Sequence, residues 1–396
     1  MTQEVSVRPE SFKSTERGTV RRTLDGYWAF YPETLPRHLD LDAESVALLD
    51  DATAAVNRLG GVGLLLPNPH LLIGPHLRLE AVLSSRIEGT QTDVPALLRL
   101  EAGQSAPPGQ AEDAREVANY VVALEHGLMR VRDGFPISTR LMREMHARLL
   151  RRVRGRHRTP GYLRKSPVWI GGDTLDNAVF VPPPPEPMCD ALRDLEKFIH
   201  EKPMPLLVQL ALVHYQFEVI HPFLDGNGRL GRILIPLLLV EREVLPEPLL
   251  YLSAYFEQNR SEYYDLLLRT SQQGDLTPWL KFFLRGIRLQ AQDAERRTHR
   301  LVTLQADLRN QLLAEGRPGS VLRLAEHLFS SPMVTARMVA RLIEVTAPTA
   351  NAAIRTLVER GDLEEVSGRE RYRLYLATEI FEAAYGPIES DEESST

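Results

Sequence analysis

Residues 221–232 read His-Pro-Phe-Leu-Asp-Gly-Asn-Gly-Arg-Leu-Gly-Arg, and this stretch decides the fold because it separates two apolar segments. Apolar residues recur at helical spacing over residues 206–217, and residues 233–240 are apolar throughout. The sequence therefore predicts a loop between two buried helices, with the glycines of the stretch at the start of the second helix.

The glycines of this loop indicate a phosphate site. Gly226, Asn227 and Gly228 can present successive backbone N–H groups, because glycine adopts backbone angles that other residues avoid. A helix N-terminus adds unpaired N–H donors and a partial positive charge. We therefore expect residues 226–228 to form a cradle for phosphate oxygens.

Four side chains of the same stretch supply complementary chemistry. Arg229 and Arg232 are three positions apart, so both can project from one side of the first helical turn and bind further phosphate oxygens. Asp225 can hold a magnesium ion between phosphates, and His221 is a base available near neutral pH. A base, a ligand for Mg²⁺ and two arginines so close together predict a catalytic site that acts on phosphates.

Composition excludes several classes of protein. The chain has 396 residues and a formal net charge of −6, which predicts two or three domains and argues against a general nucleic-acid coat or an anionic-membrane binder. The single cysteine, Cys189, excludes an internal disulfide framework and a thiolate zinc site. The N-terminus lacks the apolar core of a signal peptide, and no apolar run approaches the roughly twenty residues of a membrane span. We expect a soluble, cytoplasmic protein with no membrane partner.

The pattern along the chain is mostly helical up to about residue 290. The polar N-terminal arm carries an aromatic patch at residues 27–31, which we expect to dock the arm on the body. Val168, Trp169 and Ile170, followed by Gly171, predict an extended strand or a short hairpin. Helices are predicted at about 42–59, 74–88, 111–132, 138–153 and 295–313. The predicted domains are an N-terminal helical region (1–110), a core (111–295), a linker helix (296–317), a C-terminal module (318–380) and an acidic tail (381–396).

The C-terminal module has the order of a winged helix-turn-helix. Helices are predicted at 321–329, 335–343 and 348–360, followed by a hairpin whose tip is at Gly368. Thr349, Asn351 and Arg355 lie on the expected recognition helix. Residues 318–377 contain eight arginines and seven acids, whereas phosphate binding usually needs a clear positive excess. DNA binding, a protein partner, and the positioning of a homodimer all stay open for this module.

The stretch at 221–232 resembles, without a mismatch, the Fic-family motif His-Pro-Phe-x-(Asp/Glu)-Gly-Asn-Gly-Arg-x-x-Arg. The resemblance implies a mainly α fold, with a Fic-type helical core and a small β-hairpin flap, followed here by the winged helix-turn-helix. It also implies transfer of AMP from ATP to a hydroxyl side chain of a target protein, which could be the chain itself, with Mg²⁺ at Asp225 and His221 as the base.

Further sites follow from the same resemblance. The flap at Val168, Trp169, Ile170 and Gly171 is expected to dock the target by strand addition. The helix after the motif is expected to border the adenine, with Tyr255, Asn259 and Tyr264 as its adenine-binding residues.

A second motif precedes the core. Ser84 and Glu88 are four residues apart and share a helix face, and Gly89 is placed to end that helix. A glutamate at a helix C-terminus is opposed by the helix dipole, so another group is expected to hold it there. The pattern resembles the Fic inhibitory motif (Ser/Thr)-x-x-x-Glu-(Gly/Asn). This resemblance implies that Glu88 pairs with Arg232 and occupies the place of the ATP γ-phosphate.

Three alternative functions remain. A Doc-like kinase would transfer the γ-phosphate, but that branch has lysine where this chain has Gly228. Removal of AMP from a modified target would use Glu88 to position water. A winged-helix regulator that senses nucleotide without catalysis is the alternative from another class.

Overall fold

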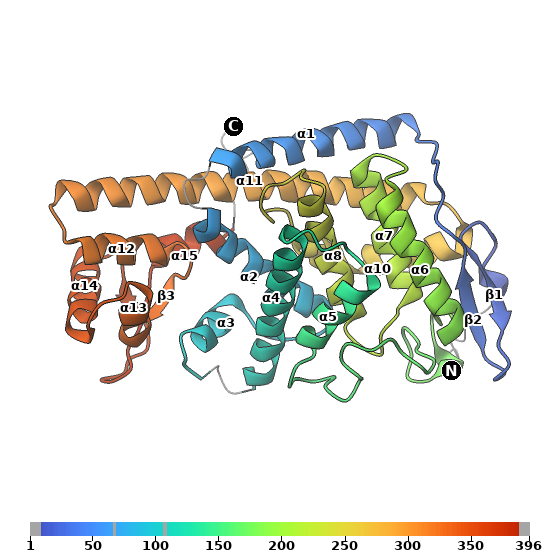
Figure 1. Cartoon of the computed structure of the whole chain (residues 1–396), viewed down its shortest axis with the longest axis horizontal. Helices are drawn as coiled ribbons and strands as arrows, with labels where there is room; N and C mark the ends of the chain where they lie inside the picture. The colour runs from blue at the N-terminus through green and yellow to red at the C-terminus, as the bar shows by residue number, and fades with distance from the viewer. Residues whose placement is uncertain (1–8, 66–68, 106–108, 388–396) are drawn as a thin grey trace.

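The structure is a computed structural model that describes residues 9–65, 69–105 and 109–387 (Figure 1). It is mainly helical with small antiparallel sheets, which confirms the predicted fold class. None of the helices in these residues is long and apolar enough to cross a membrane.

Two long helices, α1 (Ala43–Leu65) and α11 (Thr277–Ala314), lie side by side along one edge of the molecule (Figure 1). Nζ of Lys281 lies 2.7 Å from a carboxylate oxygen of Asp42, just before α1. Arg58 pairs with Glu295 farther along both helices, so the two run parallel.

The helix expected over 295–313 is not a separate linker. It is the second half of α11, and the predicted boundary at 295/296 falls inside this helix. The buried stripe of Ile287, Ala291 and Ala294 continues through Leu301 and Leu308 without a helix-breaking residue. One helix therefore carries both the core and the C-terminal module.

The centre of the core consists of α7 (Leu206–Ile220) and α8 (Asn227–Glu241), in which almost every residue is buried. This confirms the prediction of two buried helices around the 221–232 loop. The helices packed around this pair are α2 (Pro69–Ile87), α3 (Val94–Glu101), α4 (Ala111–Arg132), α5 (Thr139–Leu149), α6 (Pro185–Glu201), α9 (Ser253–Gln258) and α10 (Arg260–Gln273).

A buried carboxylate fixes α2 to its neighbours. Glu80 accepts a hydrogen bond from the hydroxyl of Tyr120 on α4 (2.9 Å) and from the hydroxyl of Ser253 on α9 (2.6 Å). Burial raises the pKa of Glu80, although these hydrogen bonds oppose the rise. Because Ser84 lies one turn farther along α2, this network also positions the end of the helix that faces α8.

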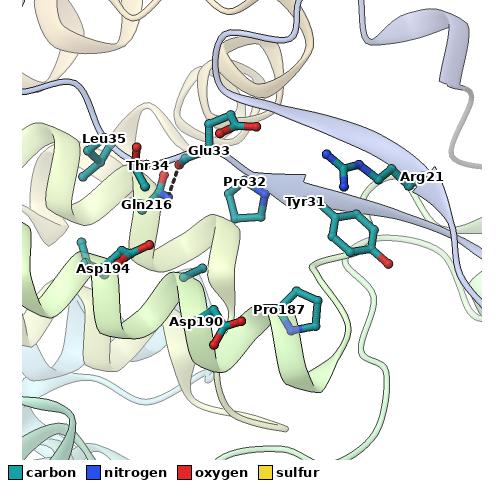
Figure 2. Close-up of a pocket in the computed structure, with 12 residues that line it drawn as sticks. Arg21, Tyr31, Pro32, Glu33, Thr34, Leu35, Pro187, Asp190, Asp194 and Gln216 are labelled. Atoms are coloured by element: carbon teal, nitrogen blue, oxygen red, sulfur yellow. Dashed lines mark hydrogen bonds between the residues drawn. The ribbon is translucent and has the colours of Figure 1, made fainter.

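The N-terminal arm forms a hairpin that the sequence did not predict, with β1 (Gly18–Arg22) paired to β2 (Trp28–Pro32). The hairpin follows the short 3₁₀ turn η1 (Pro9–Ser11). The aromatic patch expected to dock the arm lies in and just before β2: the Phe30 ring centroid is 5.4 Å from that of Phe180. A groove of about 410 Å³ separates the end of β2 from α6, and Gln216 donates a hydrogen bond to Glu33 O (2.9 Å) at its edge (Figure 2).

The predicted strand at Val168–Ile170 is reduced to a single bridge. Ile170 pairs with Phe180, and its N–H donates to Phe180 O (2.8 Å). Gly171 and Gly172 then adopt left-handed backbone angles, which turn the chain away toward the 3₁₀ turn η2 (Leu175–Asn177). The flap is therefore a loop with one bridge. Its returning leg is the segment that follows Phe180, and there Val181 O accepts a hydrogen bond from the N–H of Phe30 (2.9 Å).

The C-terminal module has the predicted order of a winged helix-turn-helix. Its sheet has the order β3-β5-β4, and Gly368 has a left-handed backbone at the hairpin tip. Asn351 and Arg355 are exposed on α14, whereas Thr349 is half-buried beside the helix cap Thr346. The elements are α12 (Gly319–Leu328), β3 (Met333–Thr335), α13 (Ala336–Leu342), α14 (Ala347–Arg360), β4 (Glu364–Glu365), β5 (Leu374–Leu376) and α15 (Thr378–Tyr385).

The predicted acidic tail begins too early in the sequence, because α15 extends to Tyr385. The buried side chains Ile380, Ala383 and Ala384 pack it against the module. Residues 388–396, which hold most of the expected acidic charge, lie outside the described residues.

The module is docked on the core at several points. Arg297 on α11 donates to the carbonyl oxygens of Ala384 (3.0 Å) and Gly386 (2.9 Å) at the end of α15. Arg78 on α2 donates to Ser330 O (2.7 Å) in the module. The helix that carries Ser84 is thus in direct contact with the C-terminal module.

We predict that Arg297→Met weakens this docking, because it leaves two buried carbonyl groups without their donor. The expected loss in unfolding free energy is about 1–3 kcal/mol, measured by urea unfolding. Amide hydrogen exchange across residues 378–386 should become faster. Arg296→Met is the matched control, because Arg296 is exposed on the same helix, and equal effects of the two substitutions would contradict the prediction.

Candidate active site

The loop between α7 and α8 has the geometry of an anion site. Gly226 adopts a left-handed backbone (φ 77°) immediately before α8. The first helical hydrogen bond of α8 joins Leu230 N to Gly226 O, so the N–H groups of residues 227–229 are not used by the helix. The Asn227 side chain instead closes the loop on itself, bonding both Phe223 N and Phe223 O at 2.9 Å.

His221 ends α7 with a left-handed backbone (φ 49°), which is uncommon for a residue other than glycine. Its Nδ1 lies 3.2 Å from Glu218 O, one turn earlier, and Nδ1 must carry the proton to donate to that carbonyl. Nε2 then keeps its lone pair. Burial lowers the pKa of His221 to about 4, and the nearby Arg164 guanidinium also lowers it. The ring is therefore neutral and able to accept a proton at neutral pH.

A second histidine, His146 on α5, packs against the 221–232 loop and supports it. Its Nδ1 accepts a hydrogen bond from Gly161 N (2.8 Å), so Nε2 carries the proton and donates to Asp225 O (2.8 Å). The ring also stacks on Phe223, with the ring centroids 3.9 Å apart. Burial lowers the pKa of His146 to about 4, which keeps it neutral and in this tautomer.

The two arginines of the motif do not form a joint clamp. Arg229 is buried against Glu116 of α4 (3.2 Å), and its other contact is a 3.5 Å approach to Asp225. Arg232, one turn later, faces α2. The expectation that both project from one side fails because Glu116, a buried acid far away in the sequence, draws Arg229 to another face of the helix.

Arg232 is almost completely buried, with 1% of its side chain exposed. It donates to the Ser84 hydroxyl (2.8 Å), to Ser84 O (3.0 Å) and to the Glu88 carboxylate (2.7 Å). Burial alone would raise the pKa of Glu88, but the Arg232 guanidinium overcomes this effect and lowers it. Glu88 is therefore ionised and paired at neutral pH, as the resemblance implied.

Glycine at position 228 makes this pairing possible. A Cβ atom there would collide with a carboxylate oxygen of Glu88 and crowd a guanidinium nitrogen of Arg232. The Glu88 carboxylate therefore lies directly over the first turn of α8, where the helix N–H groups are unpaired.

Glu88, His221 and Arg232 open onto one cavity of about 550 Å³. The flap residues Trp169, Ile170 and Gly171 also line this cavity, and so does Gly228. The remaining lining residues come mainly from α7 and α10: Val179, Phe180, Glu218, Val219, Arg260, Tyr263, Tyr264, Asp265, Leu267, Leu268 and Ser271.

Only one of the three expected adenine-binding residues lines the cavity, and this is Tyr264. Tyr255 packs in the core, with its ring centroid 4.8 Å from that of Phe282. Asn259 donates to Tyr255 O (2.9 Å) at the junction of α9 and α10. Tyr255 and Asn259 do not line this cavity, because the break between α9 and α10 at Asn259 turns their faces away from it.

Four residues that contribute to the site were not predicted: Arg164, His146, Glu116 and Glu218. Glu218 precedes His221 by one turn and lines the cavity. Its Oε1 is buried and has no hydrogen-bond partner among the described residues. Burial and the charge of Glu88 raise the pKa of Glu218 to about 8, against the opposing effect of the Arg232 guanidinium. The sequence offered one signal for Glu218, namely that a glutamate precedes the motif histidine by three residues.

The side chain of the expected metal ligand, Asp225, is 38% exposed, and its contact within the described residues is the 3.5 Å approach of Arg229. No group of three or more potential metal-binding side chains occurs in the described part of the chain. One free carboxylate fits a magnesium ion that keeps most of its water and takes its other ligands from phosphates.

Comparison with known proteins assigns these segments to families. Residues 46–129 match the Fic/DOC family N-terminal domain and residues 136–239 match the Fic/DOC family. These ranges contain Ser84 with Glu88 and the 221–232 loop, respectively. Residues 322–375 match an HTH DNA binding domain.

The chain is 28% identical over 189 residues to protein adenylyltransferase Fic of Drosophila ananassae, a match that covers 46% of this chain and 34% of that protein. The protein of the same name from Aedes aegypti is 33% identical over 125 residues, which cover 31% of this chain and 22% of that protein. The chain therefore matches about a third or less of the length of these relatives.

Among solved structures, a Fic family protein from Desulfovibrio desulfuricans G20 superimposes with a TM-score of 0.55 and 19% sequence identity. The match covers 87% of this chain and 98% of that chain. At this identity the likeness shows a shared fold.

We predict that Glu218→Gln stabilises the protein increasingly as the pH rises. The folded-state pKa of Glu218, about 8, is above its ordinary value of 4.5, so the wild type loses stability as pH rises between these values. Glutamine has no proton to lose. The difference in unfolding free energy should grow by up to about 1.4 kcal/mol per pH unit, then level off above pH 8.

Urea unfolding of both proteins at pH 5, 6.5, 8 and 9 measures this difference. Glu186→Gln, an exposed acid at the start of α6, is the control. A constant difference between Glu218→Gln and wild type across the range would show that Glu218 is ionised in the folded protein.

Proposed function

Because this chain belongs to the Fic/DOC family, we propose that it transfers AMP from ATP to a hydroxyl side chain of a target protein, under inhibition by Glu88. The observation that carries the proposal is that Arg232 and His221 open onto one cavity at the N-terminus of α8. The names of the relatives support transfer of an adenylyl group to protein.

The neutral ring of His221 supports a role as general base. Nε2 accepts the proton of a target Ser, Thr or Tyr hydroxyl, and the hydroxyl oxygen forms a bond to the α-phosphorus of ATP. The bond from that phosphorus to the oxygen bridging the β-phosphate breaks, and pyrophosphate leaves. The phosphate charge would also raise the pKa of His221 toward neutrality, where a base is most effective.

The first turn of α8 supplies the phosphate contacts. The unused N–H groups of residues 227–229 and the left-handed Gly226 suit an anion, and Arg232 provides a cation beside them. Arg229 acts by holding Asp225 and the loop in place, through its buried pair with Glu116. Asp225 would hold a magnesium ion, which neutralises phosphate charge when it is bound.

The apolar part of the cavity suits the adenine. Tyr264 on α10 presents a ring that is 40% exposed, and Leu267 and Leu268 are on the same helix. An aromatic face and aliphatic side chains give a base apolar contact without fixing its hydrogen bonds. Tyr263 is already bonded to His214 (2.9 Å), so its role is to hold α10 against α7.

The flap supports target docking by strand addition. Ile170 directs both its N–H and its C=O toward Phe180. In an antiparallel arrangement the preceding residue, Trp169, directs its own N–H and C=O to the opposite edge. That edge borders the cavity and is available to a target backbone.

Two other functions fit particular observations. Glu88 faces the same cavity as His221, so its carboxylate is placed to position water for the removal of AMP from a modified target. The match of residues 322–375 to a DNA-binding domain, with Asn351 and Arg355 exposed on α14, favours DNA as a further partner. The cytoplasmic location and the homodimer remain predictions.

Incubation of the protein with Mg²⁺ and ATP labelled at either the α- or the γ-phosphate tests the reaction class. Label from the α position on protein indicates AMP transfer, and label from the γ position indicates a kinase. Loss of label from a modified target would identify the reverse reaction.

We predict that Glu88→Gly raises AMP transfer well above wild type. The Glu88 carboxylate occupies both the guanidinium of Arg232 and the space over Gly228. ATP would then bind with its α-phosphate misaligned, and a displacement of about 1 Å can cost 10²-fold in rate. Removing the carboxylate frees Arg232 for the terminal phosphate.

Self-modification with α-labelled ATP measures this gain. Glu257→Gly is the matched control, because Glu257 makes only a 4.0 Å surface contact with Arg86. Arg232→Ala should show no gain, since it removes the phosphate contact as well. Adding His221→Ala to Glu88→Gly should lower the rate by about 10²–10⁴-fold. Autoinhibition is excluded if Glu88→Gly is no more active than wild type on any target, itself included.

We also predict that Trp169→Pro impairs modification of a protein target more than it impairs ATP binding. Proline removes a backbone N–H from the free edge of the flap while leaving the Ile170–Phe180 bridge in place. Trp169→Ala keeps the N–H and is the control for loss of the ring. Labelling of host lysate proteins and nucleotide affinity are measured on the same samples. Equal losses in both would mean that the flap only packs against the core.

A further inference from the structure

We propose that Arg164 is a positioning residue for the transfer reaction, and that its guanidinium fixes His221 and both legs of the flap in one arrangement. The proposal rests on the proposed role of His221 as the base.

The contacts of Arg164 join three segments that are distant in sequence. Nε donates to His221 O (2.8 Å), and Nη2 donates to Ile220 O (3.3 Å), both at the end of α7. Nη2 also donates to Pro183 O (2.5 Å) on the returning leg of the flap, and Nη1 to Ser166 O (3.3 Å) on its entering leg. The backbone N–H of Arg164 donates to Pro222 O (3.0 Å).

The burial of this arginine shows that these contacts determine its place. Arg164 is 2% exposed, and it forms no salt bridge with a carboxylate in the described residues. Burying a cation without an anion is costly, so the carbonyl oxygens must compensate for its lost hydration. Burial lowers the pKa of Arg164 to about 10, which still leaves it charged at neutral pH.

Two of the carbonyl groups that Arg164 binds, those of Ile220 and His221, lie at the end of α7. Those groups have no helical partner, because a helix leaves its final carbonyls unpaired. His221 follows in a left-handed conformation, which the surrounding structure has to enforce. By bonding the carbonyls of residues 220 and 221, Arg164 holds this turn and therefore the direction of the His221 ring.

A lysine could not replace these contacts. Arginine has five N–H donors in a planar fork, whereas lysine has three donors at one point. The acceptors of Arg164 come from different directions, so one ammonium group would reach only part of them. The charge, by contrast, would be kept.

The charge of Arg164 gives a readout that separates positioning from mere packing. Burial and then Arg164 lower the pKa of His221, while the Glu218 carbonyl and the charges of Glu88 and Asp225 raise it. Removing the cation should therefore raise the pKa of His221. A purely structural residue elsewhere in the loop would not move it.

The experiment uses the full chain with Glu88→Gly, to which Arg164→Gln, Arg164→Lys or Lys165→Gln is added. Lys165 is the exposed neighbour and the matched control. Self-modification with α-labelled ATP is followed from pH 4 to 9. Arg164→Gln should lose about 10²-fold in kcat, with KM for ATP unchanged, because Arg164 does not line the cavity. Its rate should fall at a higher pH than that of the parent as the solution is acidified.

Arg164→Lys should also lose rate, but the acidic limb of its pH–rate profile should stay close to that of the parent. Lys165→Gln should match the parent in both. An unchanged kcat in Arg164→Gln would overturn the proposal. So would a loss of rate in both Arg164 variants if their pH profiles were identical to each other.

Histidine NMR provides a test that does not need AMP transfer. In protein with labelled histidine, the His221 signal is assigned by its absence in His221→Asn. It should titrate at a higher pH in Arg164→Gln than in wild type, within the range where thermal unfolding shows both proteins folded. If α-label never enters the Glu88→Gly protein, the transfer function fails, while this titration still decides the role of Arg164.

Discussion

The buried guanidinium of Arg232 is the constraint on which the site depends. With 1% of its side chain exposed, it must have an acceptor for its charge at all times. Breaking a buried pair by removing one partner costs about 3–5 kcal/mol. The Glu88 carboxylate satisfies this need from α2, and a terminal phosphate would satisfy it from the cavity. In the proposed function, inhibition by Glu88 and nucleotide binding are therefore alternative ways of neutralising the same cation.

The pairing of Glu88 with Arg232 depends on α2, because this helix must hold Glu88 over Gly228 with little freedom. The Glu80 network with Tyr120 and Ser253 fixes the middle of the helix. Its first half is in contact with the C-terminal module through Arg78 and Ser330 O. The Glu88 carboxylate is therefore supported by packing that extends to the far end of the molecule, rather than by the Arg232 contact alone.

The parts of the site that the sequence predicted correctly are those in which the responsible residues are neighbours along the chain. The turn at residues 226–228 needs glycine, and the loop must join the helices on either side of it. The pairing of Glu88 with Arg232 followed from resemblance alone, since nothing local to α2 names its partner. The direction of Arg229 could not be predicted, because it depends on Glu116, which is more than a hundred residues earlier. The position of Tyr255 and Asn259 away from the cavity has a similar cause: their spacing showed helical periodicity, but the break after α9 decides which face meets the cavity.

The two glutamates at the cavity, Glu88 and Glu218, differ in charge, because Arg232 needs only one carboxylate to neutralise it. Glu218 and Glu88 both face Arg232, and a guanidinium that carries one charge cannot neutralise two buried acids. Burial and the charge of Glu88 hold the pKa of Glu218 near 8, so Glu218 stays protonated while Glu88 is ionised. The paired groups then carry no net charge, and in the proposed function a phosphate that displaces Glu88 would meet a neutral acid rather than a second anion. The unpartnered oxygen of Glu218 therefore costs stability in the resting protein but leaves the cavity open to a polyanion.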